Sequence, residues 1–274
     1  MSTRAARRPS SWLPPLPHEH GAWVALGAAA LLGFALAGGI TPAGAGLAAG
    51  AAALFASRES LSALTKPALA RRNGEGRLIV WGLALIALAA VLALPALAAR
   101  PPLLAAGAGA VGALLVHARA RRDNADRSAP VEATAMLAIF ALAPLIDEAQ
   151  RGGVTGVEVV AAATLAITLA AGISYAKMRI RQLALREPRR IDLLRTGLPP
   201  VLWHAAAAGA VAALALALHA TPLFAAVPLI ALLRCAARAW RPKREKMAAV
   251  GRQETLLLAL EFLMVLSLAG RPPV

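Results

Sequence analysis

Residues 17–40 read PHEHGAWVALGAAALLGFALAGGI, and they combine the two features that decide the fold. The stretch opens with two imidazoles, a carboxylate and an indole, and it then continues as a long apolar run. A helix needs about 20 apolar residues to cross the hydrocarbon core of a bilayer. The run therefore predicts a first membrane span. A plain membrane anchor does not need the polar groups at its entrance, so they predict a functional corner.

The composition of the whole chain supports a membrane protein. The chain has 274 residues, of which 59% are hydrophobic and 16% are charged, and its mean hydropathy is +0.64. Soluble domains usually carry about 25% charged residues. Cys235 is the only cysteine, so no disulfide within the chain and no cysteine-based metal site is expected. These features predict an all-α, polytopic transmembrane bundle.

Apolar runs close to the length of a span recur along the chain. We expect residues 1–16 to form a basic cytosolic tail and residues 17–274 a single transmembrane helical domain. The nine runs are 21–40, 43–57, 78–98, 102–118, 130–146, 156–176, 199–219, 221–237 and 253–269. The second run is short but contains Gly46-x-x-x-Gly50, a spacing that allows helices to approach closely.

The basic residues divide sharply between the two sides that nine spans would create. With the N-terminus inside, 26 of the 29 lysines and arginines fall in the cytosolic tail and connections, and only Arg100, Arg151 and Arg271 face the other side. Cytosolic loops are enriched in lysine and arginine. The partition predicts a cell inner-membrane protein with a cytoplasmic N-terminus. Topology also explains the net charge of +15, so no nucleic-acid partner is expected.

Four of the five histidines, His18, His20, His117 and His204, lie near the predicted cytosolic ends of spans. Imidazoles at one level could bind a metal, accept protons or hydrogen-bond an anion. Alternatively, each could cap or snorkel separately at the interface. The sequence has no His-x-x-x-His spacing and no cysteine partner, so we predict no metal site and no cofactor.

Two carboxylates and two bases complete the set of unusual polar residues. Glu254 and Glu261 are seven apart and share one helical face, and an isolated carboxylate at the mid-membrane position of Glu261 costs a few kcal/mol. It must be protonated, paired or turned toward a wet cavity. Lys177 and Arg181 share a face if the helix continues, and two such bases can hold a phosphate. The cytosolic position of Lys177 and Arg181 also explains their positive charge without any ligand.

Other carboxylates have simpler interpretations. Glu132 begins the fifth run and suits the positive end of a helix dipole. Glu158 lies near the outer end of its run. We interpret both as structural.

The stretch Pro17–Trp23 resembles the Pro-x-Glu-His-Gly-Ala-Trp signature that opens the YwiC-like bacterial membrane proteins. Two later stretches are similar to the same family: Lys177 with Ile180-Arg181, and Arg241-Pro242-Lys243 followed by Gly251-x-x-Glu254 with a longer spacing. The resemblance implies a multi-pass membrane protein and no particular activity.

The architecture also resembles the UbiA-type prenyltransferases, which place functional groups in the cytosolic loops after the second and sixth spans. Those enzymes use aspartates there to hold Mg²⁺ and a prenyl diphosphate. The corresponding stretches here, Ser57–Lys66 and Lys177–Arg181, contain bases and no aspartate. This departure argues against Mg²⁺-dependent transfer and leaves a metal-free cationic pocket for an anionic headgroup or diphosphate.

Three functional hypotheses follow. The leading one is a cytosol-facing pocket for an anionic or lipid-like ligand, such as a membrane lipid or an isoprenoid. The alternatives are a UbiA-like transferase and a proton-coupled transporter that uses Glu261. No catalytic residue is assigned, and the sequence does not decide whether the chain is an enzyme. The predicted ligand-binding residues are Glu19, His20, Trp23, Lys177, Arg181, His204 and Glu254.

Overall fold

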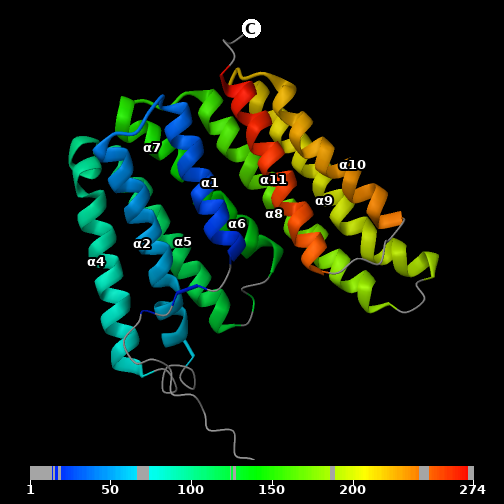
Figure 1. Ribbon diagram of the computed structural model, residues 1–274, viewed down its shortest axis with the longest axis horizontal. Helices are drawn as coiled ribbons and strands as arrows, with labels where there is room; N and C mark the ends of the chain where they lie inside the picture. The colour runs from blue at the N-terminus through cyan, green and yellow to red at the C-terminus, as the bar shows by residue number, and fades with distance from the viewer. Residues whose placement is uncertain are drawn as a thin grey trace, which may run out of the picture.

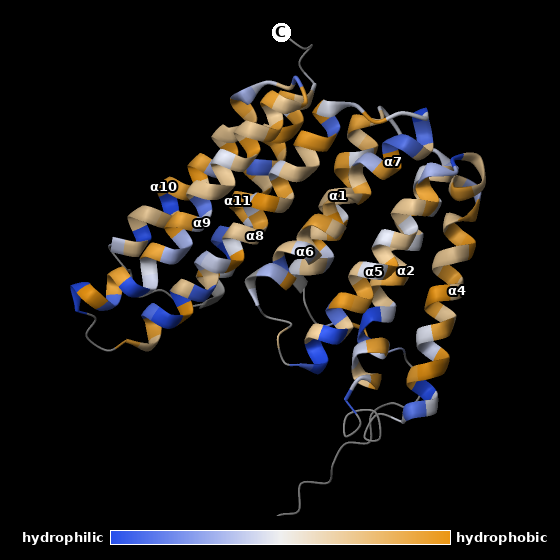
Figure 2. Cartoon of the chain, turned by 180° about the vertical axis from the view of Figure 1, so that it is seen from behind, coloured by the Kyte–Doolittle hydropathy of each residue, from blue (hydrophilic) through white to orange (hydrophobic). Residues whose placement is uncertain are grey.

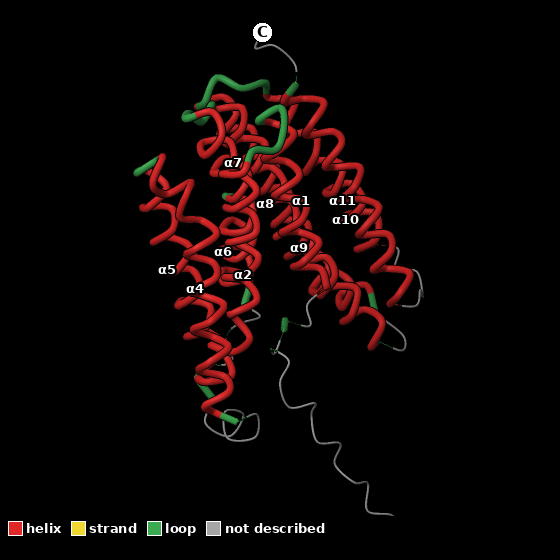
Figure 3. Tube along the Cα trace, turned by 60° about the vertical axis from the view of Figure 1, so that its left-hand side comes forward, coloured by secondary structure: helices red, strands yellow, loops and turns green. Residues whose placement is uncertain are grey.

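The computed structural model is built from α-helices and one short 3₁₀ helix, with no strand in the part of the chain that it describes (Figures 1 and 3). The structure describes residues 14, 16, 17, 20–66, 74–123, 125, 128–185, 189–240 and 247–270. The predicted all-α class is therefore confirmed.

The helices follow the predicted runs in order. They are α1 (His20–Leu36), α2 (Pro42–Leu64), α4 (Glu75–Ala99), α5 (Pro102–Arg122), α6 (Ala129–Phe140), α7 (Leu142–Arg151), α8 (Gly156–Ala184), α9 (Arg190–Ala217), the 3₁₀ helix η1 (Pro222–Ala225), α10 (Ala226–Trp240) and α11 (Met247–Ala269). The fifth run corresponds to α6 and α7 together, and the eighth to η1 and α10. The arrangement is consistent with about nine spans.

Six helical segments are long and apolar enough to cross a membrane by length and composition. They are Glu75–Ala99, Pro102–Arg122, Pro130–Arg151, Gly156–Ala184, Arg190–Ala217 and Pro222–Trp240. The apolar helix Gly21–Leu36 is shorter. The protein is thus a multi-pass membrane protein, as its composition predicts.

Two stretches that the sequence suggested as loops are helical. α2 continues through Ser57–Leu64, and α8 continues through Lys177–Arg181 to Ala184. An apolar run in the sequence marks only the part of a helix that can lie in the hydrocarbon core. Backbone hydrogen bonds continue beyond it, because Arg, Glu, Leu and Ala favour helix in water as well. The loop assignment was therefore wrong for Ser57–Leu64, and for Lys177–Arg181 the structure shows the helical alternative.

Successive spans run in opposite directions, with α6 and α7 together forming one span, and this creates two distinct ends of the bundle. We call the basic end the one at which α2, α5, α8 and α10 end and α4, α6, α9 and α11 begin (Figure 1). Figure 2 shows hydrophilic residues at this end of α5, α8 and α9, and others in α7 near the opposite end. The last turns of α5, α8 and α10, which lie at this end, carry Arg119, Arg121, Arg122, Arg181 and Arg238.

α8 lies at the centre of the packing. The main buried cluster includes Leu32, Phe140, Ile146, Leu165 and Phe224, which come from α1, α6, α7, α8 and η1. α8 also packs against α9, α10 and α11 (Figures 1 and 3). It therefore connects the two parts of the bundle.

The predicted close-packing glycines lie against α4. A Cβ atom on Gly50 would sit 2.9 Å from the carbonyl oxygen of Ala89, and one on Gly46 would meet the carbonyl oxygen of Leu92. Both obstacles are backbone atoms, so they cannot move aside as a flexible side chain would. The two glycines therefore allow the backbones of α2 and α4 to approach closely.

Replacing Gly50 with alanine should lower the free energy of unfolding by about 1–3 kcal/mol, because an added methyl group must push α2 away from α4. The thermal midpoint of the detergent-solubilised protein, followed by size-exclusion chromatography, checks this. Gly107→Ala is the matched control, since a Cβ there meets nothing within 4 Å. An equal midpoint for the two variants would refute the close approach.

Candidate functional site

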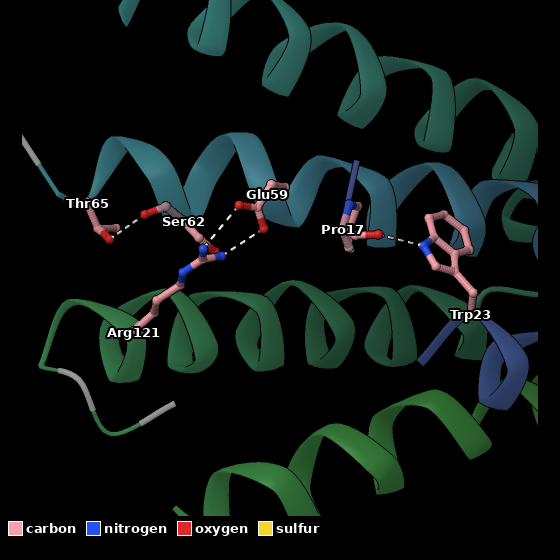
Figure 4. A network of polar contacts seen from close by, with 6 residues as sticks. All are labelled: Pro17, Trp23, Glu59, Ser62, Thr65 and Arg121. Atoms are coloured by element: carbon pink, nitrogen blue, oxygen red, sulfur yellow. Dashed lines mark hydrogen bonds and ion pairs between the residues drawn. The ribbon is translucent and has the colours of Figure 1, made fainter. Parts of the chain in front are cut away.

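The first predicted site residue, Trp23, joins the start of α1 to α2. Its indole Nε1 donates a hydrogen bond to the carbonyl oxygen of Pro17 at 3.1 Å (Figure 4). Its ring packs edge-to-face on Phe55, with the ring centroids 4.8 Å apart. The guanidinium of Arg58 lies over the Phe55 ring, 5.2 Å from its centroid. Glu19 and the side chain of His20, which were predicted to share this corner, lie outside the described residues.

The last turns of α2 are tied to α5 by an ion pair. Arg121 donates two hydrogen bonds to Glu59, at 2.8 Å and 3.1 Å, and both side chains are largely buried (Figure 4). The Thr65 hydroxyl donates to the carbonyl oxygen of Ser62 at 2.7 Å, which closes the end of the helix. Two parallel N–H···O bonds fix the geometry of an arginine–carboxylate pair. The pair therefore holds α2 and α5 together at the basic end.

Neutralising Glu59 with glutamine should reduce stability by about 1 kcal/mol or more, because Arg121 would lose its charged partner. Exchanging the two charges, Glu59→Arg with Arg121→Glu, should restore part of the loss. Thermal midpoints of the single and double variants measure this. The exposed pair Arg119–Asp123 provides the control, and Asp123→Asn should change little. If the charge-exchanged double variant has a thermal midpoint no higher than those of the single variants, the ion pair between Glu59 and Arg121 is contradicted.

Lys177 and Arg181 lie four residues apart on α8, which continues through both, so they share a face of this helix. The Lys177 ammonium lies 2.5 Å from a carboxylate oxygen of Glu132 on α6. Arg181 is exposed. Glu132, interpreted from the sequence as a helix-dipole residue, thus also neutralises Lys177. The pair connects α6 to α8 at the basic end.

The remaining predicted residues gather around Arg234. We define the Arg234 cluster as Tyr175, His204, Arg234, Glu254 and Glu261, from α8, α9, α10 and α11. The guanidinium forms an ion pair with Glu254 and lies over the Tyr175 ring, 4.4 Å from its centroid. Tyr175 is only 1% exposed. The cluster lies about 10 Å inside the basic end, since Arg234 is six residues before the end of α10.

The guanidinium of Arg234 keeps part of its donor capacity. One Nη2–H is used by Glu254, whereas the buried Nε atom has no hydrogen-bond partner. A guanidinium carries five N–H donors in a fixed plane. The Nε–H of Arg234 is therefore a donor that no described group uses.

His204 is oriented by its own helix. It is 1% exposed, and its Nδ1 lies 2.7 Å from the carbonyl oxygen of Pro200. A carbonyl oxygen can only accept, so Nδ1 carries the proton and Nε2 of the neutral ring is left as an acceptor. The helix that carries His204, α9, packs against α10, which carries Arg234.

Glu261 lies deeper in the bundle than Glu254. It is 4% exposed, and its Oε1 atom has no hydrogen-bond partner. Glu254 and Glu261 are separated by about 10 Å along α11. Arg234 and Glu254 are the charged groups that act on it most strongly. The cluster thus combines one guanidinium with two carboxyl groups at different depths.

The predicted ligand-binding residues that the structure describes consequently lie in three places, apart from Arg181, which is exposed near the end of α8. Trp23 lies between α1 and α2, Lys177 lies between α6 and α8, and His204 and Glu254 belong to the Arg234 cluster. Tyr175 lies two residues before Lys177, about 200° around the helix, so the two side chains of α8 face different neighbours.

The sequence interpretation missed Arg234 and Tyr175 as site residues. Arg234 was counted only as a cytosolic base. Its place inside the apolar run 221–237 was the available signal, because a charge within a span usually faces the bundle interior.

The described residues contain no group of three or more His, Cys, Asp and Glu side chains arranged to hold a metal ion.

The fold and this intramembrane polar cluster define a multi-pass helical membrane protein. Residues 16–146 match the family model of the YwiC-like protein. This range includes the Pro17–Trp23 motif, so the resemblance seen in the sequence is confirmed over these residues. No curated protein and no solved structure matches the chain.

Proposed function

We propose that the protein binds an anionic, lipid-like ligand at the Arg234 cluster, entering from the basic end. The observation that carries this proposal is the state of Arg234. This arginine lies inside a membrane bundle, and its guanidinium contacts Tyr175 and Glu254. Its buried Nε–H donor has no hydrogen-bond partner. Guanidinium groups are well suited to phosphate and carboxylate oxygens, which they bind through two N–H donors.

Glu254 has a specific role in this proposal. It neutralises Arg234 when no ligand is bound, since an unpaired charge inside a membrane protein is costly. An incoming anion competes for the same guanidinium. Uptake of a proton by Glu254 would remove that competition and leave the full charge of Arg234 for the ligand.

The surroundings of the cluster favour a ligand with a hydrocarbon part. Leu233, Leu256 and Leu260 on α10 and α11 are 70%, 67% and 59% exposed, so they present apolar surface to lipid beside the polar groups. A headgroup could bind Arg234 while its chain remains in the bilayer. Membrane phospholipids and isoprenoid diphosphates share this chemistry.

The basic end is proposed to face the cytoplasm of a bacterial inner membrane, with the N-terminus on the same side. The support is the concentration of lysine and arginine at the helix ends and connections of that side. Ligand would then reach the cluster from the cytosolic leaflet.

A binding assay on the full chain in nanodiscs tests the proposal. The anionic probes are labelled geranylgeranyl diphosphate and labelled phosphatidylglycerol, and their neutral counterparts are geranylgeraniol and phosphatidylcholine. At least one anionic probe should bind more tightly than its neutral counterpart, and the two arms identify the headgroup. Equal binding within both pairs would reject an anion site.

Proton-coupled transport is the second candidate, and Glu261 is the observation that favours it. A buried intramembrane carboxyl group with an unpartnered oxygen can exchange a proton, and such groups mark proton relays. In this candidate the anion on Arg234 and a proton on Glu261 move together. Their opposite charges would lower the cost of passing the hydrocarbon.

A further inference from the structure

The Arg234 cluster is buried on one side and open on another. Tyr175 on α8 and His204 on α9 are each only 1% exposed. The side chains of Arg234 and Glu254 are 23% and 29% exposed, although they lie about 10 Å inside the basic end. Charged side chains within a membrane protein usually face the bundle interior or a water-filled space. The exposed part of this ion pair therefore marks where the cluster opens.

Gly172 on α8 lies at this opening. It is three residues before Tyr175, so the two residues share a face of the helix. A Cβ atom on Gly172 would lie 3.8 Å from Oε2 of Glu254, and no other atom from a neighbouring helix of the described chain would come within 4 Å. Arg234 donates its hydrogen bond to Oε1 of Glu254, so Oε2 is the oxygen that faces Gly172. The missing side chain thus leaves space beside the ion pair.

This space is not required for helix packing. Gly46 and Gly50 on α2 lie directly against backbone oxygens of α4, whereas Gly172 has no such close neighbour among the described residues. A methyl group on Gly172 would make an ordinary van der Waals contact with Glu254. Alanine also favours a helix interior more than glycine does. Packing and helix stability would therefore both accept a side chain at this position, and the space is available to a ligand.

We infer that the space over Gly172 is the passage through which a ligand reaches Arg234 from the basic end, and that the first carbons of its chain lie there when the headgroup is bound. The inference rests on the anion site proposed above, and it adds the route, which runs between α8 and α11. Glu254 lies beside the passage, so the incoming anion meets the carboxyl group with which it competes. Gly172 is then a specificity-determining residue, because a larger side chain would exclude the chain of the ligand.

Equilibrium binding to the full chain in nanodiscs tests the passage, with geranylgeranyl diphosphate and phosphatidylglycerol as the two probes. Gly172→Leu fills the space, and it should weaken binding of whichever probe the parent binds by about tenfold or more. Gly172→Ala adds only an ordinary contact and should bind almost as the parent does. Gly209→Leu on α9 is the matched control. Gly209 is exposed and a Cβ there meets nothing within 4 Å, so binding should stay the same.

Protection of a cysteine gives a second measurement that does not depend on the folding of Gly172→Leu. Gly172→Cys should react with a thiol reagent, whereas Cys235 is 0% exposed and adds little background. The bound probe should slow the reaction, and its neutral counterpart should not. Unchanged binding by a folded Gly172→Leu chain, or no protection of Gly172→Cys by a bound probe, would overturn the passage and leave the anion site standing. A parent chain that binds neither probe more tightly than its neutral counterpart would reject the anion site itself, and the passage with it.

Discussion

Replacing Arg234 with glutamine should weaken binding of the anionic probe by roughly 10- to 100-fold. A hydrogen bond to a charged group contributes about 1.5–3 kcal/mol, and each 1.4 kcal/mol is tenfold in Kd. Glutamine keeps a polar side chain but lacks both the charge and the planar set of N–H donors. Equilibrium binding in nanodiscs gives the two dissociation constants. Binding of the neutral counterpart should stay the same.

Two further variants separate a specific site from a general effect of charge. Arg119→Gln removes one positive charge from an exposed position at the basic end of α5 and should leave binding unchanged. Arg234→Lys keeps the charge and loses the planar donors, so its affinity should fall between those of the parent and Arg234→Gln. Equal losses for Arg119→Gln and Arg234→Gln would mean that the probe senses only the basic surface.

Replacing Glu261 with glutamine should flatten the pH dependence of binding. When Glu261 gives up its proton, a negative charge appears near Arg234 and competes with the anion. In the parent chain the Kd should therefore rise with pH, by at most about tenfold per unit if one proton is linked to binding. The glutamine variant cannot ionise, so its affinity should change less over the same pH range.

Vesicle flux extends this test to transport. If anion and proton move together, flux through the parent should depend on the proton gradient and flux through Glu261→Gln should not. Glu75→Gln, at an exposed carboxylate that begins α4, is the control. A pH profile identical in the parent and Glu261→Gln chains would remove Glu261 from the account.

The order of the helices was predictable because the hydrocarbon core of a bilayer allows a chain few structures other than helices. Backbone groups in a bilayer must be satisfied within a helix, so apolar runs near 20 residues become helices. Their true lengths were not predictable in the same way. α2 continues past the end of its run at residue 57 to Leu64, since interfacial Arg, Glu and Ser residues remain helical once the apolar part has formed a helix.

The site was predictable only in part. Glu254 and Glu261 could be assigned to one face from their spacing, and His204 could be assigned to the bundle interior. Arg234 joins them through α10, and an ion pair between residues 20 positions apart on different helices has no local sequence signal.

The Kd of the anionic probe for the Glu254→Gln chain, compared with the parent and Arg234→Gln, is the most direct measurement of the central claim. Removing Glu254 frees Arg234 from its competing partner, so binding should tighten by about tenfold, in the range expected for a partly exposed ion pair. The account predicts the order Glu254→Gln tightest, parent intermediate and Arg234→Gln weakest. Weaker binding by a folded Glu254→Gln chain than by the parent would contradict it.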